Sequence, residues 1–377
     1  MSDSRSDILA LAEERKALSV EAPASGLRRR WQVLLWSTLG PIAAILAAFV
    51  VSGLMLLVAG FDPLFAFATL LRGAFGDLRV ISEVLLQATP LMLIGVGLAV
   101  AFRSNIWNIG AEGQFYAGAV LSTIAGIYLG MLPAVVLVPL VLVLGFVGGA
   151  LWGVLAGWFK VRFGASEIVT TIMLNYVAII GTGYLVTGPM IEQAGTYPQT
   201  AKVAEAARLY RFLPPTRLHI GFLLALVFAV IVYVLLFKTS TGYAIRAAGH
   251  NQTAARYAGI DVERTVLLAM GISGGAAGLA GAIQVSGLTF RLYQQISPGY
   301  GFTGIAVALL AGNHPLGVIL SALLFGALRS GSEVMQISAK IPSVLVFVVQ
   351  GLVILSVVSY GVYQMKLFGR LRVAKEG

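Results

Sequence analysis

Apolar runs long enough to cross a lipid bilayer recur along the whole chain, and this pattern constrains the fold more than any other feature. A spanning helix needs about 20 consecutive, mainly apolar residues. Of the 377 residues, 58% are hydrophobic and only 11% are charged, whereas soluble domains carry about 25% charged residues. The sequence therefore predicts an all-α fold, a polytopic transmembrane helical bundle that forms one membrane domain.

About ten membrane segments are expected from these runs. Two of the later runs are short for full spans and are separated by Gly312-Asn313-His314-Pro315, so they are interpreted either as half-helices or as a tightly turned pair. The predicted segments are 35–59, 81–102, 107–130, 133–158, 167–189, 218–237, 265–286, 301–312, 315–329 and 342–363.

The distribution of basic residues predicts the topology. The net charge is +10, and Lys and Arg gather at segment ends, as the excess of positive charge in cytoplasmic loops requires; nucleic acid is therefore not expected as a partner. Residues 1–30 form a predicted cytoplasmic tail, 31–365 the membrane domain and 366–377 a cytoplasmic basic tail. The loop at about 190–217 should then lie outside the cytoplasm, although it is basic too.

Several kinds of catalytic site find no support in the sequence. There is no Cys, the three His are scattered, and no Gly-Lys dipeptide occurs. Metal clusters and a phosphate-binding loop ending in Gly-Lys-Ser/Thr are therefore not expected. Gly271-Ile-Ser-Gly-Gly275 matches a nucleophile motif only formally, because it lies in an apolar run instead of a strand-to-helix turn. We expect no enzyme activity, no bound metal and no cofactor in this chain.

Regularly spaced glycines predict close contacts between helices. Gly145, Gly149, Gly153 and Gly157 recur every four residues in one predicted segment. The pairs Gly271/Gly275 and Gly274/Gly278 repeat this spacing in 265–286. Small residues at such spacing let two helices approach closely within a membrane. These glycines indicate a packed bundle and say nothing about a substrate.

The most polar stretch inside the apolar region is Asn105-Ile-Trp-Asn-Ile-Gly-Ala-Glu-Gly-Gln114. At membrane depth, such groups must find partners or line a wet cavity. On a continuous helix, Asn105, Asn108, Glu112 and Tyr116 would share one face, while the glycines at 110 and 113 would permit a break. The side chains are candidates for a transport pathway, or alternatively they fix the bundle through hydrogen bonds.

A second polar face runs through Glu167, Thr171 and Asn175. Glu167 follows Ser166, so a capping role at a helix N-terminus is as plausible as a functional one. Asn175 and Tyr176 are deeper and are the better candidates. The complete set of translocation-pathway candidates is Asn105, Trp107, Asn108, Glu112, Gln114, Tyr116, Thr171, Asn175, Tyr176 and Gln284.

The loop at about 238–264 differs from an ordinary solvated loop. Its stretch 242–259 is rich in alanine and predicts a short helix with turns on the cytoplasmic side. Such a helix could dock into a groove on a soluble partner. The alternative is a surface helix that lies at the lipid headgroups.

These motifs resemble one protein family. Phe102-Arg-Ser-Asn-Ile-Trp-Asn-Ile-Gly-Ala-Glu-Gly-Gln-Phe-Tyr116, Ser166-Glu-Ile-Val-Thr-Thr-Ile-Met-Leu-Asn175 and Ala247-Ala-Gly-His-Asn-Gln-Thr-Ala-Ala-Arg-Tyr-Ala-Gly-Ile260 are similar to the permease subunits of bacterial ABC importers. The resemblance covers roughly 35–363 and is closest to the nucleoside, or simple-sugar, branch of the branched-chain amino acid, ribose and nucleoside permeases. It implies that the 238–264 loop couples to an ATPase, through residues that include Arg246, Gly249, His250, Asn251, Ala255, Arg256 and Gly259.

The resemblance also implies a larger assembly in the bacterial inner membrane. It would contain a second permease, expected to form a heterodimer with this chain, two ATP-binding subunits that use ATP and magnesium, and an extracytoplasmic binding protein. Nucleosides are the expected cargo, and ribose or other simple sugars are the alternative. A hypothesis of another class is a stand-alone ion-coupled secondary transporter that uses Glu112 and Glu167 as proton or sodium sites.

Overall fold

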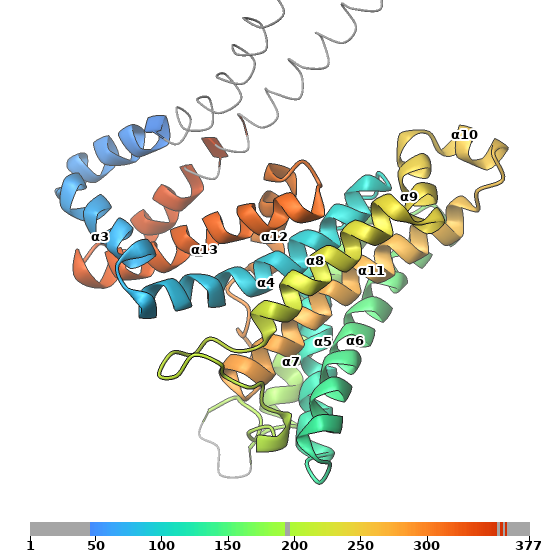
Figure 1. Ribbon diagram of the computed structural model, residues 1–377, viewed down its shortest axis with the longest axis horizontal. Helices are drawn as coiled ribbons and strands as arrows, with labels where there is room; N and C mark the ends of the chain where they lie inside the picture. Colours follow the sequence, from blue (N-terminus) through green and yellow to red (C-terminus); the bar gives the residue numbers. More distant parts are fainter. Residues whose placement is uncertain (1–45, 193–196, 353–354, 357–358, 360–377) are drawn as a thin grey trace, which may run out of the picture.

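The computed structural model describes residues 46–192, 197–352, 355–356 and 359, and these residues are helical with connecting loops (Figure 1). Within them there is no strand, and two isolated β-bridges join Gln199 to Tyr293 and Arg211 to His219. The labelled helices are α3 (Pro63–Phe75), α4 (Leu78–Arg103), α5 (Ala111–Tyr128), α6 (Ala134–Phe163), α7 (Glu167–Thr187), α8 (Gly221–Lys238), α9 (Ser240–His250), α10 (Gln252–Tyr257), α11 (Val262–Gln284), α12 (Tyr300–Leu310) and α13 (Pro315–Ser338). A 3-10 turn, Glu205–Ala207, precedes α8, and a π-helical turn, Val285–Thr289, extends α11.

Within the described residues, six helices are long and apolar enough to cross a membrane, which confirms the predicted helical membrane bundle. They are α4, α6, α7, α8, α13 and the combined helix Val262–Thr289. Four further apolar helices are shorter: Leu46–Val58, Pro63–Phe75, Tyr300–Leu310 and Ser343–Leu352. Some predicted regions lie outside the described residues. They are residues 35–45 of the segment 35–59, residues 353–354, 357–358 and 360–363 of the segment 342–363, and both predicted tails.

Several predicted boundaries are wrong for physical reasons. α3 was not predicted; it begins where Asp62 accepts the N–H of Leu64 at 2.9 Å, with a proline as the first helical residue, both of which favour a helix start. The predicted segment 315–329 continues to Ser338, because charged residues end the apolar run without ending the helix. In contrast, α12 spans only 11 residues, which agrees with the half-helix interpretation of 301–312.

α4 and α11 form the centre of the bundle. In their most apolar stretches, 89% of α4 and 72% of the helix containing α11 are buried, against 28% for each of α6, α7 and α8. α11 packs against α4, α5 and α6, and α13 packs against α4 and α3. α6, α7 and α8 therefore present their apolar outer faces to the surroundings, as helices in contact with lipid do.

The glycine spacing brings α6 and α11 into close contact, as predicted. A Cβ atom at Gly149 would lie 2.6 Å from the Cα of Gly278, and one at Gly153 would lie 3.2 Å from the Cα of Gly274. Larger side chains would therefore force the two backbones apart. Gly275 faces Phe146, and Ser273 lies inside α11, so the formal Gly-x-Ser-x-Gly match is part of a packed helix.

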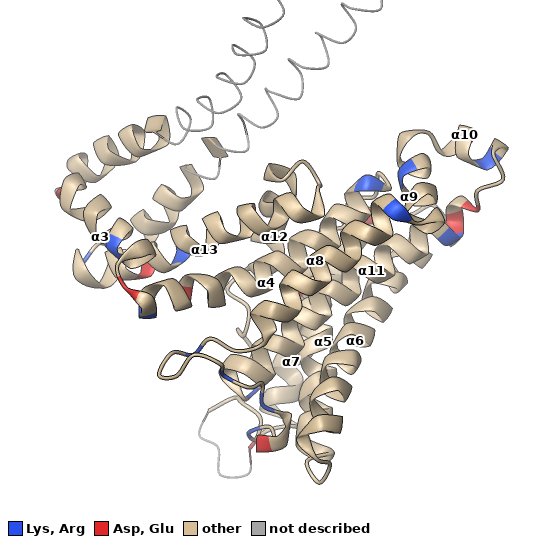
Figure 2. Ribbon diagram, in the orientation of Figure 1, with Lys and Arg blue, Asp and Glu red and all other residues tan. Residues whose placement is uncertain are grey.

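Charged residues are concentrated away from the helix centres (Figure 2). One group surrounds α9 and α10, which project at one end of the bundle, here named the α9–α10 end. Another lies on the loop between α7 and α8 at the opposite end, here named the far end. A third lies where α4 begins and α13 ends, and it includes Glu83, Arg329 and Glu333 inside these two long helices.

Candidate functional site

The polar decapeptide forms a break between α4 and α5. α4 ends at Arg103, α5 begins at Ala111, and Asn105 adopts a left-handed φ of 59°. The prediction that Asn105, Asn108, Glu112 and Tyr116 share one helical face is therefore wrong, because a continuous helix does not cover them. Asn105 is exposed at the α9–α10 end, whereas the other three are buried. Trp107 is also exposed, and its ring packs 5.1 Å from that of Phe102.

Asn108 is held in a closed hydrogen-bond network inside the bundle. Its Nδ2 donates to Gln114 Oε1 and to Ser273 Oγ, both at 2.9 Å. Its Oδ1 accepts from Gln114 Nε2 and from the main-chain N–H of Gly110, both at 3.0 Å. Both groups of the Asn108 amide are thus satisfied by the protein, as buried polar groups require. The network fastens the break to the first turn of α5 and to α11.

Asn175 on α7 fastens the same break from the other side. Its Oδ1 accepts the N–H of Gly113 at 2.7 Å, and its Nδ2 donates to the carbonyl of Ile109 at 2.9 Å. The N–H groups in the first turn of a helix have no partner within the helix. The Asn175 side chain supplies one to α5, and a Cβ at Gly113 would contact the Asn175 backbone at 2.9 Å.

Glu112 and Tyr116 join α5 to the start of the half-helix α12. Glu112 Oε2 accepts the N–H of Gly301 at 2.6 Å, in the first turn of α12. A carboxylate is favourable at this position because a helix N-terminus carries partial positive charge. The hydroxyl of Tyr116 accepts the N–H of Ser297 at 3.4 Å, and Ser297 Oγ accepts the N–H of Tyr300 at 3.1 Å. α12 thus begins inside the protein, and the N–H groups of Tyr300 and Gly301 in its first turn have side-chain partners.

Of the other pathway candidates, Thr171 also packs at the break, since a Cβ at Gly110 would lie 3.0 Å from the Cβ of Thr171. Thr171 is buried and donates to the carbonyl of Glu167 at 2.6 Å, and Glu167 Oε2 pairs with Lys160 Nζ at 2.6 Å. Ser166 occupies the N-cap of α7 but makes no capping hydrogen bond. Tyr176 is 57% exposed and lies apart from the buried groups, whereas Gln284 is buried near the end of α11. The structure therefore brings together Asn108, Glu112, Gln114, Tyr116 and Asn175 around the α4–α5 break.

The loop predicted to dock a soluble partner consists of the two short helices α9 and α10. Thr239 caps α9 by accepting the N–H of Gly242 at 3.1 Å, and Asn251 caps α10 by accepting the N–H of Ala254 at 3.0 Å. Ala255 is buried, while Arg256 is exposed and Tyr257 is 90% exposed. Tyr257 is an addition to the predicted residues of this surface. Gly259 ends α10 with a φ of 80°.

The root of α9 is fastened to three other parts of the bundle. Arg246 donates to the carbonyl of Leu236 at the end of α8 and lies over the ring of Phe237, 5.2 Å from its centre. Arg103 at the end of α4 lies over the same ring at 4.9 Å, and its Nε donates to the carbonyl of Asn313 at 2.7 Å. A Cβ at Gly249 would lie 3.1 Å from the Cα of Ser104. His250 and Gly249 line a small cavity of about 230 Å³ at this junction.

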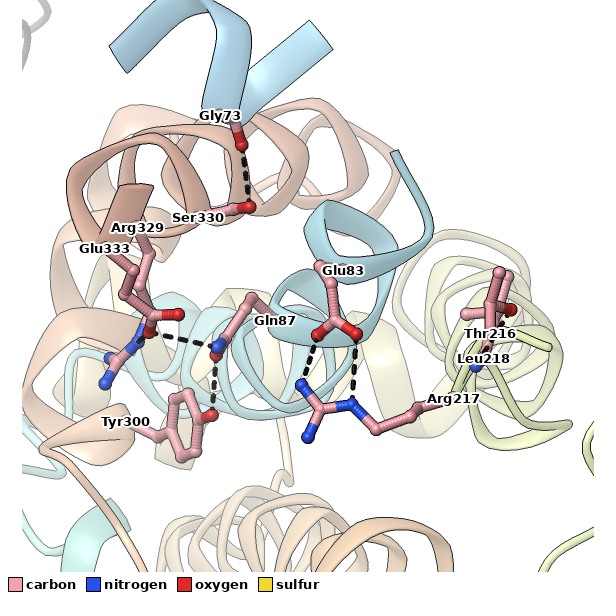
Figure 3. Close-up of polar contacts among 10 residues, drawn as sticks. All are labelled: Gly73, Glu83, Gln87, Thr216, Arg217, Leu218, Tyr300, Arg329, Ser330 and Glu333. Atoms are coloured by element: carbon pink, nitrogen blue, oxygen red, sulfur yellow. Dashed lines mark hydrogen bonds and ion pairs between the residues drawn. The ribbon is translucent and has the colours of Figure 1, made fainter. Parts of the chain in front are cut away.

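A row of polar side chains between α4 and α13 was missed by the sequence analysis (Figure 3). Gln87 on α4 accepts from the Tyr300 hydroxyl at 2.8 Å and donates to Glu333 at 3.3 Å. Arg329, one turn before Glu333 on α13, lies 4.9 Å from the centre of the Tyr300 ring. Its Nε lies 3.9 Å from Glu333 Oε1, too far for a hydrogen bond. We name Gln87, Arg329 and Glu333 the α4–α13 polar row.

A neighbouring ion pair continues the row toward the far end. Arg217, just before α8, donates through Nε and Nη2 to the two carboxylate oxygens of Glu83, at 3.0 and 2.8 Å. These bonds to Glu83 raise the pKa of Arg217 above its ordinary value. The signal that could have revealed these residues was available, since ionisable side chains inside apolar segments are rare and functional by default.

Comparison with known proteins agrees with this architecture. The family model described as branched-chain amino acid transport system / permease component matches residues 80–358. The guanosine ABC transporter permease protein NupP of Bacillus subtilis is 37% identical over 328 residues, 85% of this chain and 92% of NupP. The glucose ABC transporter permease protein TsgB13 of Haloferax volcanii is 33% identical, covering 91% of this chain and 92% of TsgB13.

A second Bacillus subtilis protein, the guanosine ABC transporter permease protein NupQ, is 27% identical over 67% of this chain and 81% of NupQ. No solved structure gives a significant match. The family match covers most of the chain and includes both the α4–α5 break and the α9–α10 helices. The chain therefore belongs to the family of permease components of branched-chain amino acid transport systems.

Proposed function

We propose that the chain is the membrane-spanning permease subunit of an ATP-driven importer of nucleosides. The observation that carries this proposal is the pair α9–α10, which projects from a bundle of apolar helices and exposes Arg256 and Tyr257. An exposed short helix with an aromatic and an arginine side chain suits a protein interface, where both residue types are enriched. The partner on this surface is an ATPase subunit, which supplies the energy.

The connections of α9 support a mechanism for coupling. Movement of α10 by the ATPase would act on α9, whose root contacts the ends of α4 and α8. Arg103 at the end of α4 in turn donates to Asn313, in the turn between α12 and α13. The α4–α5 break and the half-helix α12 are joined through Glu112 and Gly301. A push at the α9–α10 end would therefore reach the middle of the bundle through packed elements and would alternate the side to which the pathway opens.

This mechanism requires the α9–α10 end to lie in the cytoplasm of a bacterial cell, with the protein in the inner membrane. The two predicted tails, which lie outside the described residues, are proposed for the same side. The loop between α7 and α8 then lies outside despite its basic residues. Two of these residues have local partners, since Arg208 pairs with Glu205 at 3.2 Å and Arg217 pairs with Glu83.

The proposed assembly contains further subunits. NupP and NupQ are two guanosine permease proteins of one bacterium, which supports a second, different permease beside this chain. Two ATP-binding subunits would use ATP and magnesium, and an extracytoplasmic binding protein would deliver the cargo; this chain itself would hold no cofactor. The similarity to TsgB13, a glucose permease, supports simple sugars as the alternative cargo.

The stand-alone secondary transporter is less well supported by the geometry. It requires Glu112 and Glu167 to bind and release a proton or sodium ion. Glu112 is buried against the start of α12, and Glu167 forms an ion pair with Lys160. Both carboxylates are thus occupied by groups that stabilise the bundle, and they belong to different regions of it.

The identity of the cargo can be tested with the purified assembly. The chain would be isolated with its native partners through a tag, and ATP hydrolysis would be measured with the binding protein and guanosine, ribose or glucose. Guanosine is expected to stimulate hydrolysis most strongly. Stimulation by sugars alone would overturn the nucleoside assignment, and the absence of any copurifying ATPase would overturn the importer itself.

A further inference from the structure

The α4–α13 polar row cannot be surrounded by lipid. Charged side chains within membrane helices are costly in hydrocarbon and face protein or a water-filled cavity. Gln87 is in the first half of α4, and Arg329 and Glu333 are in the second half of α13, two helices long enough to span a membrane. Yet the Glu333 side chain is 56% exposed. This face must therefore meet water, cargo or the proposed second permease instead of lipid.

Hydrogen-bonding capacity in the row remains unused. The Nε atom of Arg329 is buried and has no hydrogen-bond partner among the described residues. Leaving a buried donor unsatisfied is unfavourable, and more so when the donor is charged. Glu333 accepts a single bond, from Gln87, among the residues that the structure describes. A carboxylate offers about four acceptor sites, so both charged members of the row can still bind a polar ligand.

The charges of the row favour an uncharged ligand. Arg329 and Glu333 carry opposite charges, and the adjacent Arg217–Glu83 pair is also balanced. The region thus has no excess charge that would attract an ion. It instead places a guanidinium, an amide and a carboxylate side by side, a set that can donate to and accept from adjacent groups of one molecule.

We propose that Gln87, Arg329 and Glu333 line the cargo pathway and determine its specificity, by binding an uncharged solute that carries neighbouring donors and acceptors, such as a nucleobase edge or a sugar diol. This inference rests on the proposed transport function and assigns its recognition step to named residues. Tyr300 donates to Gln87 and is a positioning residue for the row, and the Arg217–Glu83 pair lies one turn away along α4.

Water access to the row can be measured directly, because the chain contains no Cys. Glu333→Cys would be treated with a water-soluble, membrane-impermeant thiol reagent in vesicles that contain the full assembly. Leu320→Cys is the matched control, since Leu320 is exposed on the same helix but is apolar. Rapid labelling at position 333, slowed several-fold by guanosine with its binding protein, is expected, with little labelling at position 320.

Two labelling results would overturn the proposal. Labelling at position 333 that is no faster than at position 320 would mean that the row is not accessible to water. Rapid labelling that neither guanosine nor glucose slows would mean that cargo does not reach it. Uptake by the wild-type assembly is measured in parallel, so that failure of the transport function itself is seen separately as an absence of ATP-dependent uptake of every cargo.

A second measurement separates recognition from a merely structural role. Maximal uptake rates for guanosine, cytidine and glucose would be compared in Gln87→Leu and Glu333→Gln, each with saturating binding protein. Loss of one hydrogen bond to the cargo should change the ratio between cargoes about 3- to 10-fold. Ser332→Ala is the control, because this buried hydroxyl on α13 has no partner among the described residues. Equal loss for all cargoes, with unchanged ratios, would contradict recognition by the row.

Discussion

Asn175 of α7 donates and accepts across the α4–α5 break, and its Oδ1 accepts the N–H of Gly113 at 2.7 Å. The Asn175 side chain therefore replaces the main-chain hydrogen-bond partners that a continuous helix would provide. Replacing it with leucine would leave this N–H and the carbonyl of Ile109 unsatisfied inside the protein. Each orphaned group costs about 1–3 kcal/mol.

We expect Asn175→Leu to lower the melting temperature of the purified assembly clearly, with a loss of about 2 kcal/mol or more in unfolding free energy. Thermal unfolding in detergent measures the effect. Tyr176→Phe is the control, since this neighbouring side chain is 57% exposed. A wild-type melting temperature for Asn175→Leu would show that the amide does not stabilise the break.

The contact between α6 and α11 gives a second prediction. A Cβ at Gly149 would lie 2.6 Å from both Cα and N of Gly278, and both atoms belong to the backbone. Gly149→Val should therefore separate the helices, costing about 1–3 kcal/mol through overpacking, and should reduce the amount of folded protein in the membrane. Gly181→Ala on α7 is the control, since nothing lies within 4 Å of its added Cβ. Equal yields and melting temperatures for both variants would contradict the packing account.

The exposed surface of α10 gives a third prediction. Arg256→Glu combined with Tyr257→Ala should reduce ATP-dependent uptake at least about tenfold, as loss of interface anchors worth about 2 kcal/mol would, while the melting temperature of the chain stays unchanged. Arg162→Glu is the control, because Arg162 is exposed at the end of α6 and lies outside α10. Gly249 is unsuitable for this test, since its Cβ would meet the backbone at the end of α4. Normal uptake in the double variant would remove α10 from the coupling surface.

His219 makes stability depend on pH at the far end. It is buried before α8, where its Nδ1 accepts the N–H of Gly221 at 3.1 Å. Burial, reinforced by the nearby Arg211, lowers the pKa of His219 from 6.5 to about 4. Between pH 6.5 and about pH 4, His219 is therefore mostly protonated in the unfolded chain and mostly neutral in the folded chain. The free energy of unfolding consequently decreases as the pH falls below about 6.5.

Between pH 7 and pH 5 this difference amounts to about 2 kcal/mol. The melting temperature of the wild type should fall over this range by more than that of His219→Gln, which cannot take up the proton. Melting curves at matched ionic strength measure the difference. Parallel pH profiles for the two proteins would show that His219 is not kept neutral by burial.

The helical membrane fold was predictable because apolar run length and glycine spacing act locally. That spacing predicted a close contact between helices, such as that of Gly149 with Gly278, but it did not predict that α6 would pair with α11. The α4–α5 break was only partly predictable. Glycines at 110 and 113 indicated it, but the left-handed backbone at Asn105 and the start of α5 at Ala111 depend on Asn175 and Ser273, which are distant in sequence.

The α4–α13 polar row could not be predicted from the sequence, because its residues come from different helices. The predicted segment ends at Arg329, because a charge interrupts a hydropathy pattern, whereas α13 continues past it to Ser338. Its neighbours Gln87 and Tyr300 come from two other helices, and only the packing of α12 against α4 brings them together. Spacing within one segment therefore could not reveal the row.

The central proposal is tested most directly by measuring whether ATP or an ion gradient drives uptake. The chain would be reconstituted into vesicles, alone or with the second permease, the ATPase subunits and the binding protein, and guanosine uptake would be measured with either ATP or an imposed ion gradient. We predict uptake only in the complete assembly, dependent on ATP and insensitive to ionophores. Gradient-driven uptake by this chain alone, abolished in Glu112→Gln, would contradict the importer and establish a secondary transporter.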